Sequence, residues 1–234
     1  MNKNDVRLNA AWQRRASLHT SANINAYRLI NRAGDGFPDL AIDRFGDVLV
    51  AHVYSQGVKV PSPRATLETL ADRVGAQAVY LKYRPVQGNI LDDRTRQSLT
   101  PTDPLIGRAV ERVGVIENGS RFIIRPAEGL NPGLFLDMRE MREFVRAHAA
   151  GKTVLNCFAY TCAFGVAASQ GGAARVLNLD ISRRYLDWGR ENAELNGLAG
   201  VTAKIVETRH EPNLDFPRVP GAQPYLKVCV VRIE

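Results

Sequence analysis

The chain has few cysteines, no long apolar run and no apolar leader, and each absence excludes a class of protein. Its 234 residues include three cysteines, Cys157, Cys162 and Cys229, too few for a disulfide framework. They do not have the spacing of a zinc site, and no metal site is predicted. No run of about 18 apolar residues occurs, so no membrane span is expected. Residues 1–5 lack an apolar signal region. We therefore expect a cytoplasmic protein.

The glycine-rich sequence G-x-G-x-x-G is also missing, which argues against a nicotinamide or flavin oxidoreductase. What is present is an excess of basic residues: 31 Lys and Arg against 24 Asp and Glu, with a pI near 9.6. This balance fits a polyanionic partner such as RNA. It also fits a genome rich in Arg codons, because the charges are spread along the chain without a Lys/Arg block.

The first part of the chain is predicted to be a small strand–strand–helix–strand module with an added hairpin. Alternating apolar residues predict strands, and apolar residues at spacings of three and four predict helices. The predicted helices are residues 6–18 and 61–74. The predicted strands are 39–45, 48–54, 78–82, 110–116 and 121–125, and the last two are joined by Asn118-Gly119, a strong hairpin signal. Residues 88–104 are expected to form a loop.

A turn at 129–133 leads into the second part. A helix is predicted over 137–149, with Asp137 as its N-cap. A buried strand from residue 154 then breaks into a small-residue turn that opens a helix, and a second strand, 176–179, ends on Asp180. Further strands are expected at 201–206 and 225–233, around an irregular segment with four prolines. We divide the chain into domains 1–126 and 127–234.

The turn after the first of these strands, together with Asp180, predicts a nucleoside site. In doubly wound sheets, a carboxylate about 20 residues after the first turn binds ribose hydroxyls at the carboxyl ends of the strands. Two alternatives remain open. The turn is also what an ordinary strand–helix connection looks like, and Asp180 could cap the next helix with Ser182.

Four motifs, in the same order, resemble the ribosomal RNA large-subunit methyltransferase I-like family. They span residues 11–198. The motifs are Tyr27-Arg28-Leu29-Ile30-Asn31 with Gly34-Asp35-Gly36-Phe37-Pro38-Asp39-Leu40-Ala41-Ile42-Asp43-Arg44-Phe45-Gly46; Gly133-Leu134-Phe135-Leu136-Asp137-Met138-Arg139; Leu155-Asn156-Cys157-Phe158-Ala159-Tyr160-Thr161-Cys162; and Asn178-Leu179-Asp180-Ile181-Ser182.

The resemblance implies an α/β fold, with a small α+β RNA-engaging module followed by an incomplete Rossmann-like methyltransferase domain. It implies S-adenosylmethionine as cofactor and ribosomal RNA as partner, with methylation at cytosine C5 as the best-known reaction. It also implies a set of cofactor-binding residues: Asn156, Cys157, Phe158, Ala159, Tyr160, Thr161 and Cys162 around the methionine part, Asp180 at the ribose, Ile181 against the adenine, and Phe135 and Arg139 beside the pocket.

The chain departs from the family pattern at several points. Ala163 stands where the family usually has Gly. An N-terminal pseudouridine-synthase-like domain and the Asp-Pro-Pro motif are absent, and the tail from about residue 201 matches nothing in the pattern. We therefore expect a truncated or frame-shifted product whose exposed sheet edge favours self-association.

Methylation at C5 uses a cysteine thiolate. Cys157 and Cys162 lie in the cofactor turn and Cys229 in the unmatched tail, so no catalytic residue is named. The alternative function is a non-catalytic remnant that retains RNA binding.

Overall fold

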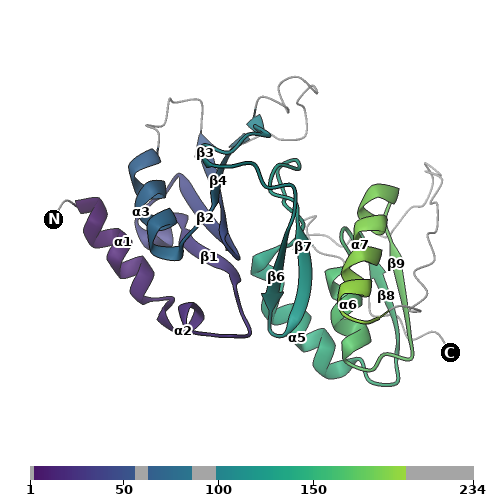
Figure 1. Cartoon of the computed structure of the whole chain (residues 1–234). Helices are drawn as coiled ribbons and strands as arrows, with labels where there is room; N and C mark the ends of the chain where they lie inside the picture. Colours follow the sequence, from purple (N-terminus) through teal and green to yellow (C-terminus); the bar gives the residue numbers. More distant parts are fainter. Residues whose placement is uncertain (1–2, 56–62, 86–98, 199–234) are drawn as a thin grey trace, which may run out of the picture. The chain divides into compact units, whose positions relative to one another are not determined.

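The computed structural model describes residues 3–55, 63–85 and 99–198, and the chain divides into two compact units (Figure 1). The first unit is Met1–Leu136 and the second is Asp137–Glu234. The domain boundary expected from sequence lay ten residues earlier, after residue 126. Most of the predicted loop 88–104 and all of the segments predicted beyond residue 200 lie outside the described residues. Within the described part of the chain, no helix is long and apolar enough to cross a membrane.

The first unit contains a five-stranded sheet in the order β1-β2-β3-β4-β5. The strands are β1 (Ala26–Asn31), β2 (Leu40–Phe45), β3 (Val48–Ser55), β4 (Ala78–Pro85) and β5 (Ile106–Gly107). All neighbouring pairs are antiparallel except β3 and β4. That pair is parallel because a helix, α3 (Arg64–Val74), connects the two strands. The predicted hairpin over 39–54, helix 61–74 and strand 78–82 are confirmed.

Apolar side chains from α1 (Lys3–Gln13) and α3 pack on one face of this sheet. Leu8, Ala11, Leu67 and Leu70 on the helices are almost fully buried with apolar side chains of all four long strands. The predicted helix 6–18 is wrong in one respect: it is broken after residue 13, and a separate short helix, α2 (Ala16–His19), follows.

Strand β1 was not predicted. Its burial does not alternate, because a register shift between Arg28 and Ile30 interrupts its pairing with β2. Leu29 and Ile30 are consequently both buried in the same core, and the period of two that identifies a strand is lost.

The predicted hairpin at Asn118-Gly119 is confirmed as β6 (Val113–Glu117) and β7 (Ser120–Ile124). Both turn residues have positive φ, 48° for Asn118 and 80° for Gly119, as this two-residue connection requires. The backbone N–H of Asn25 donates to the carbonyl of Ile116 at 2.9 Å, so the hairpin lies beside the start of β1.

A row of buried and partly buried polar side chains crosses β1 to β4 in the first unit. Arg28 Nε donates to Asp43 Oδ1 at 2.7 Å, and His52 Nε2 lies 3.6 Å from Asp43 Oδ2. Arg84 Nε donates to His52 Nδ1 at 3.2 Å, so the His52 proton sits on Nε2, facing the carboxylate. Burial lowers the pKa of His52, which keeps the ring neutral.

Lys82, on β4, is fully buried and donates to the carbonyl of Gly129. Arg84 donates to the Leu130 carbonyl at 3.1 Å and to Asn131 Oδ1 at 2.7 Å. These two cations therefore fix the segment that precedes the second unit. Burial, with a smaller effect from the nearby Arg84 charge, lowers the pKa of Lys82 to about 7.

The second unit is built around a parallel pair of strands, β8 (Thr153–Cys157) and β9 (Arg175–Leu179) (Figure 1). Helix α6 (Ala163–Gln170) connects them and packs against both strands and against α5 (Arg139–His148). Helix α7 (Arg183–Leu195) follows β9. The predicted strand at residue 154, the helix after it and the strand 176–179 are confirmed.

The predicted N-cap Asp137 is wrong. This residue lies inside a 3-10 turn, η3 (Leu136–Met138), and α5 begins at Arg139 with no side-chain cap. The local pattern of an acidic residue ahead of an apolar stripe is shared by capped helices and by such turns, because both place a carboxylate near free backbone N–H groups.

Candidate functional site

The loop between β8 and α6 reaches the tip of the neighbouring strand. Cys157 and Leu179 are paired at the carboxyl ends of β8 and β9. Beyond them, the backbone N–H of Ala159 donates to the carbonyl of Leu179 at 2.9 Å. The turn residues 158–162 and Asp180 are thus brought together, as the sequence predicted, at the edge where parallel sheets bind ligands.

This turn has an unusual backbone. Phe158, Tyr160 and Cys162 have positive φ angles of 56°, 50° and 59°. A non-glycine residue in this left-handed region costs on the order of 1–3 kcal/mol, so the surrounding structure must compensate for it. Cys162 immediately precedes α6, and its N–H donates to the Ala159 carbonyl at 2.8 Å.

Ala163 is the first residue of the helix and is not among the residues of positive φ. The methyl group that the family usually lacks therefore sits on helical backbone.

Asp180 supports the turn directly. Its Oδ2 accepts a hydrogen bond from the Tyr160 N–H at 2.8 Å, and its Oδ1 accepts one from the Ser182 N–H at 2.9 Å. Ser182 is the N-cap of α7, and its hydroxyl accepts from the Tyr185 N–H. The capping role considered for Asp180 is therefore shared: Ser182 caps the helix and Asp180 holds Ser182. A carboxylate has about four lone-pair positions, so acceptor capacity remains for a ligand.

Two apolar side chains flank Asp180 in the open. Phe158 is 79% exposed and Ile181 is 88% exposed, the highest values among the large apolar residues that the structure describes. Their place beside a carboxylate at the strand tips suits a ligand that has both a flat apolar ring and hydroxyl groups.

Helix α7 supports the turn from the protein interior. The side chain of Asn192 is fully buried and donates to the Thr161 carbonyl at 3.0 Å. Gly189 lies against Cys162: a Cβ atom added there would stand 2.8 Å from the Cys162 Cβ. The ring of Tyr160 meets that of Tyr185 edge-on, with centroids 4.5 Å apart.

A buried pair of asparagines lies under the turn. Asn156 on β8 and Asn178 on β9 are directly paired in register, and Asn156 Nδ2 donates to Asn178 Oδ1 at 2.8 Å. A Cβ atom on Gly165 would stand 2.8 Å from Asn178 Nδ2, so α6 can approach the strands only with glycine there. The side chain of Asn156 is therefore in the interior, below the predicted methionine site.

Four of these supporting residues were not predicted from the sequence: Asn178, Gly165, Gly189 and Asn192. The strand register offers a signal for Asn178, because it occupies the same place in its strand as Asn156 does in the neighbouring one. Nothing in the sequence marks the other three, since their roles depend on how closely α6 and α7 approach the loop.

Of the two cysteines of the turn, Cys162 is not suited to nucleophilic attack. Cys162 is buried, and burial, reinforced by the Asp180 charge, raises the pKa of its thiol to about 12. It therefore stays protonated at neutral pH. Cys157 is half-buried at the end of β8. Cys229 lies outside the described residues. In the part of the chain that the structure describes, no three His, Cys, Asp or Glu side chains are grouped to hold a metal ion.

Phe135 and Arg139 belong to different units. Phe135 is 43% exposed in the first unit, and Arg139 begins α5 in the second, with its Nε 3.1 Å from Glu140 Oε1. Their predicted place beside the cofactor stays a prediction.

A comparison with known families matches most of the chain, in both units. The model of the S-adenosylmethionine-dependent methyltransferases matches residues 27–229. The chain belongs to this family. S-adenosylmethionine is accordingly its cofactor, and the turn of β8 with Asp180 lies inside the matched region. The match runs to residue 229 and so extends into the tail after residue 201.

Curated relatives act on ribosomal RNA by name. Ribosomal RNA large subunit methyltransferase I of Aeromonas salmonicida is 35% identical over 198 residues, which cover 82% of this chain and 47% of that protein. Ribosomal RNA large subunit methyltransferase K/L of Alteromonas mediterranea is 38% identical over 192 residues, covering 79% of this chain and 26% of that protein. The chain thus spans about half the length of methyltransferase I and about a quarter of K/L.

Solved structures agree with the fold. A SAM-dependent methyltransferase from Streptococcus mutans is 30% identical, with a TM-score of 0.72 over 86% of this chain and 50% of that one. A methyltransferase complexed with SAH is 28% identical, with a TM-score of 0.70 over the same shares. The predicted α/β fold with a Rossmann-like methyltransferase unit is confirmed.

Proposed function

We propose that this chain binds S-adenosylmethionine at the carboxyl ends of β8 and β9 and transfers its methyl group to ribosomal RNA. The observation that carries the proposal is the Asp180 carboxylate, which joins the turn after β8 to the start of α7 through the N–H groups of Tyr160 and Ser182. These two hydrogen bonds hold the Asp180 carboxylate, an acceptor for ribose hydroxyls, next to the backbone turn at the ligand-binding edge of the sheet.

The surroundings of Asp180 match the remaining parts of the cofactor. The exposed side chain of Ile181 offers an apolar surface to the adenine. The turn of Phe158, Ala159, Tyr160 and Thr161 faces the methionine part. When bound, S-adenosylmethionine supplies a methyl group on a positively charged sulfur. The chain's own residues then bind and orient the donor.

The substrate is inferred from the relatives, whose names specify large-subunit ribosomal RNA. The finer proposal is methylation at cytosine C5. That carbon is a weak nucleophile and is normally activated by a thiolate that adds to C6, after which a base removes the C5 proton. The raised pKa of Cys162 argues against a thiolate at that position. The nucleophile is therefore not assigned to the described residues.

Calorimetric titration with S-adenosylmethionine, followed by a labelled-methyl transfer assay on large-subunit ribosomal RNA, tests the proposal. We expect Asp180→Ala to weaken cofactor binding by about 1–3 kcal/mol, the scale for losing a buried charge-assisted hydrogen bond. Asp187→Ala on α7 is the matched control, because it removes a half-exposed carboxylate that pairs with Arg190. Equal affinity in the wild type and in Asp180→Ala would show that the ribose lies elsewhere.

The same assays separate the alternative function, a non-catalytic chain that retains RNA binding. Binding of RNA without heat from S-adenosylmethionine and without label transfer would favour that alternative. Label in the RNA, located by nuclease digestion and mass spectrometry, would identify the modified nucleotide and test the C5 proposal directly.

A further inference from the structure

Four arginines surround the connection between β1 and β2 in the first unit. This connection contains a short 3-10 helix, η1 (Arg32–Asp35), and ends at Asp39, before β2 begins. The arginines are Arg7, Arg14, Arg15 and Arg32, and we call them the arginine patch. Two carboxylates lie in the same connection: Asp35, which is buried, and Asp39, which is exposed. The patch therefore has more positive than negative charge.

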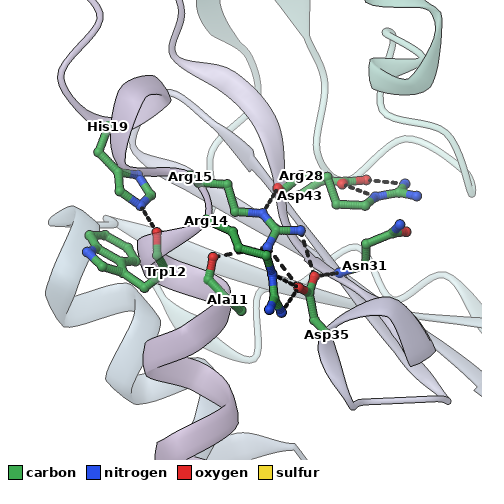
Figure 2. A network of polar contacts seen from close by, with 9 residues as sticks. All are labelled: Ala11, Trp12, Arg14, Arg15, His19, Arg28, Asn31, Asp35 and Asp43. Carbon is green, nitrogen blue, oxygen red and sulfur yellow. Dashed lines mark hydrogen bonds and ion pairs between the residues drawn. The ribbon is translucent and has the colours of Figure 1, made fainter.

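The guanidinium of Arg15 is sufficient by itself to neutralise the charge of the Asp35 carboxylate. Its Nη1 and Nη2 donate to the two carboxylate oxygens at 2.8 and 2.6 Å, and its side chain is 14% exposed (Figure 2). Its other donors go to the carbonyls of Arg28 and Ala11, both at 3.0 Å. The Asn31 N–H adds a further bond to Asp35 at 2.6 Å. Arg15 is thus a structural anchor, with all three guanidinium nitrogens engaged in hydrogen bonds.

Arg14 is a second guanidinium on a carboxylate that already has its counter-ion. Its Nε donates to Asp35 Oδ1 at 3.0 Å and its Nη2 donates to the same oxygen (Figure 2). Its side chain is 51% exposed. Within the described residues, Nη1 of Arg14 has no protein acceptor. Asp35 therefore holds this guanidinium at the surface in a fixed orientation. Its positive charge is not fully neutralised, because Asp35 is shared with Arg15, and its Nη1 donors are available to a ligand.

Arg32 is also held at the surface, by different contacts. Its guanidinium carbon lies 4.3 Å from the centre of the Tyr54 ring, and its Nε donates to the Pro38 carbonyl at 3.1 Å. Because the ring covers one flat side of the guanidinium, its in-plane Nη donors stay available, and the described residues supply no acceptor for them. Arg32 also has a positive φ of 47°, a strained conformation of the kind that is found at functional sites.

Arg7 completes the surface. It lies on α1, seven residues before Arg14, which directly follows the end of that helix and whose N–H donates to the Ala10 carbonyl at 3.2 Å. Its side chain crosses Gly36, where an added Cβ would stand 3.1 Å from Arg7 Cδ and Nε. Gly36 has a φ of 80° and is the C-cap of η1. The glycine thus gives the turn its left-handed conformation and leaves room for the Arg7 side chain.

From these contacts we infer that Arg7, Arg14 and Arg32 form a contact surface for the phosphate backbone of the RNA substrate. The guanidinium fork matches phosphate oxygens with two parallel N–H donors, and ordered side chains lose little entropy on binding. An RNA rather than an acidic protein is favoured because the proposed substrate is ribosomal RNA, so this inference rests on the proposed function. Contacts to phosphate oxygens fix the position and orientation of a nucleic acid, so this surface would position the RNA without selecting its sequence.

The test measures affinity of the full chain for large-subunit ribosomal RNA at several salt concentrations. The variant is Arg7→Gln with Arg14→Gln and Arg32→Gln. The matched control is Arg64→Gln with Arg108→Gln and Arg121→Gln, three exposed arginines of the same unit that change the net charge equally. We expect at least a tenfold loss of affinity for the patch variant, and a slope of log K against log salt that is smaller by about 2 to 3. The control should lose much less.

Equal losses in the two variants would overturn the inference, as would an unchanged salt slope in the patch variant or a wild type that does not bind RNA. Displacement of the RNA by polyglutamate of equal charge would show a general polyanion surface and would also overturn it. Arg14→Lys, which keeps a cation on Asp35, and a thermal melt of each variant separate lost contacts from lost folding.

Titration with S-adenosylmethionine gives an independent result. A patch variant that binds the cofactor normally but loses RNA supports the inference, whereas failure of the wild type to bind the cofactor refutes the proposed function alone.

Discussion

Asn192 on α7 donates a hydrogen bond of 3.0 Å to the carbonyl oxygen of Thr161, in the turn that follows β8. Both residues are buried, Asn192 completely. The bond ties the last turn of one helix to the loop that precedes another. The turn with three left-handed residues is thus held by two side chains, the Asp180 carboxylate at Tyr160 and the buried Asn192 amide at Thr161.

Replacing Asn192 by Leu should loosen the turn without removing a cofactor contact. We expect a loss of about 1–3 kcal/mol in the free energy of unfolding, because the Thr161 carbonyl is left buried without this partner. We also expect about tenfold weaker binding of S-adenosylmethionine. Thermal unfolding and calorimetric titration measure the two effects. Arg190→Gln, an exposed change on the same helix, is the control. A destabilised variant that binds the cofactor as tightly as the wild type would show that the turn keeps its shape without Asn192.

Gly189 and Cys162 should show strong energetic coupling. A methyl group at position 189 would meet Cys162, so Gly189→Ala should destabilise the protein by about 1–3 kcal/mol through overpacking. Cys162→Gly removes the opposing side chain and suits the positive φ of that position. In the double variant we expect most of the loss to be recovered. A double-mutant cycle measured by denaturant unfolding checks this prediction, and additive losses would contradict it.

The thiol of Cys162 should be unreactive in the native protein. Because its pKa is raised to about 12, the thiolate is scarce throughout the neutral range, and burial also limits access. Treatment with iodoacetamide at pH 8, followed by mass spectrometry of peptides, should label Cys162 only after unfolding. Rapid labelling of Cys162 in the native protein would show that the turn opens.

Lys82 should make the stability of the protein depend on pH in the alkaline range. Its pKa is lowered from 10.5 to about 7 in the folded state. Between these two values the unfolded chain holds a proton that the folded chain has released, so the free energy of unfolding rises with pH. The rise is at most about 1.4 kcal/mol per pH unit. Lys82→Met should remove this rise, which unfolding in urea at several pH values between 7 and 10 would show. Parallel curves for the wild type and variant would mean that Lys82 stays charged.

Local sequence patterns identified most elements of the described chain. The Asn118-Gly119 hairpin followed from its two positive-φ positions, and the β2–β3 hairpin followed from apolar segments around a short turn. Strand β1 was not predicted, because its pairing contains an irregularity at Arg28 that removes the alternation of buried and exposed side chains. The helix predicted over 6–18 missed the break after Gln13, and no local pattern reveals that the Arg15 guanidinium hydrogen-bonds to Asp35, twenty residues away.

What the sequence determined by itself is the order of elements and the chemistry at the strand ends: a turn of small residues after β8 and a carboxylate after β9. Those features depend on neighbours along the chain, where the periods of helix and strand act. Only the tertiary structure decided that Asn192 and Gly189 support the turn and that Asp35 orients Arg14. These contacts join residues 21 to 31 positions apart or depend on how closely two helices approach, and that distance is fixed by packing rather than by local sequence.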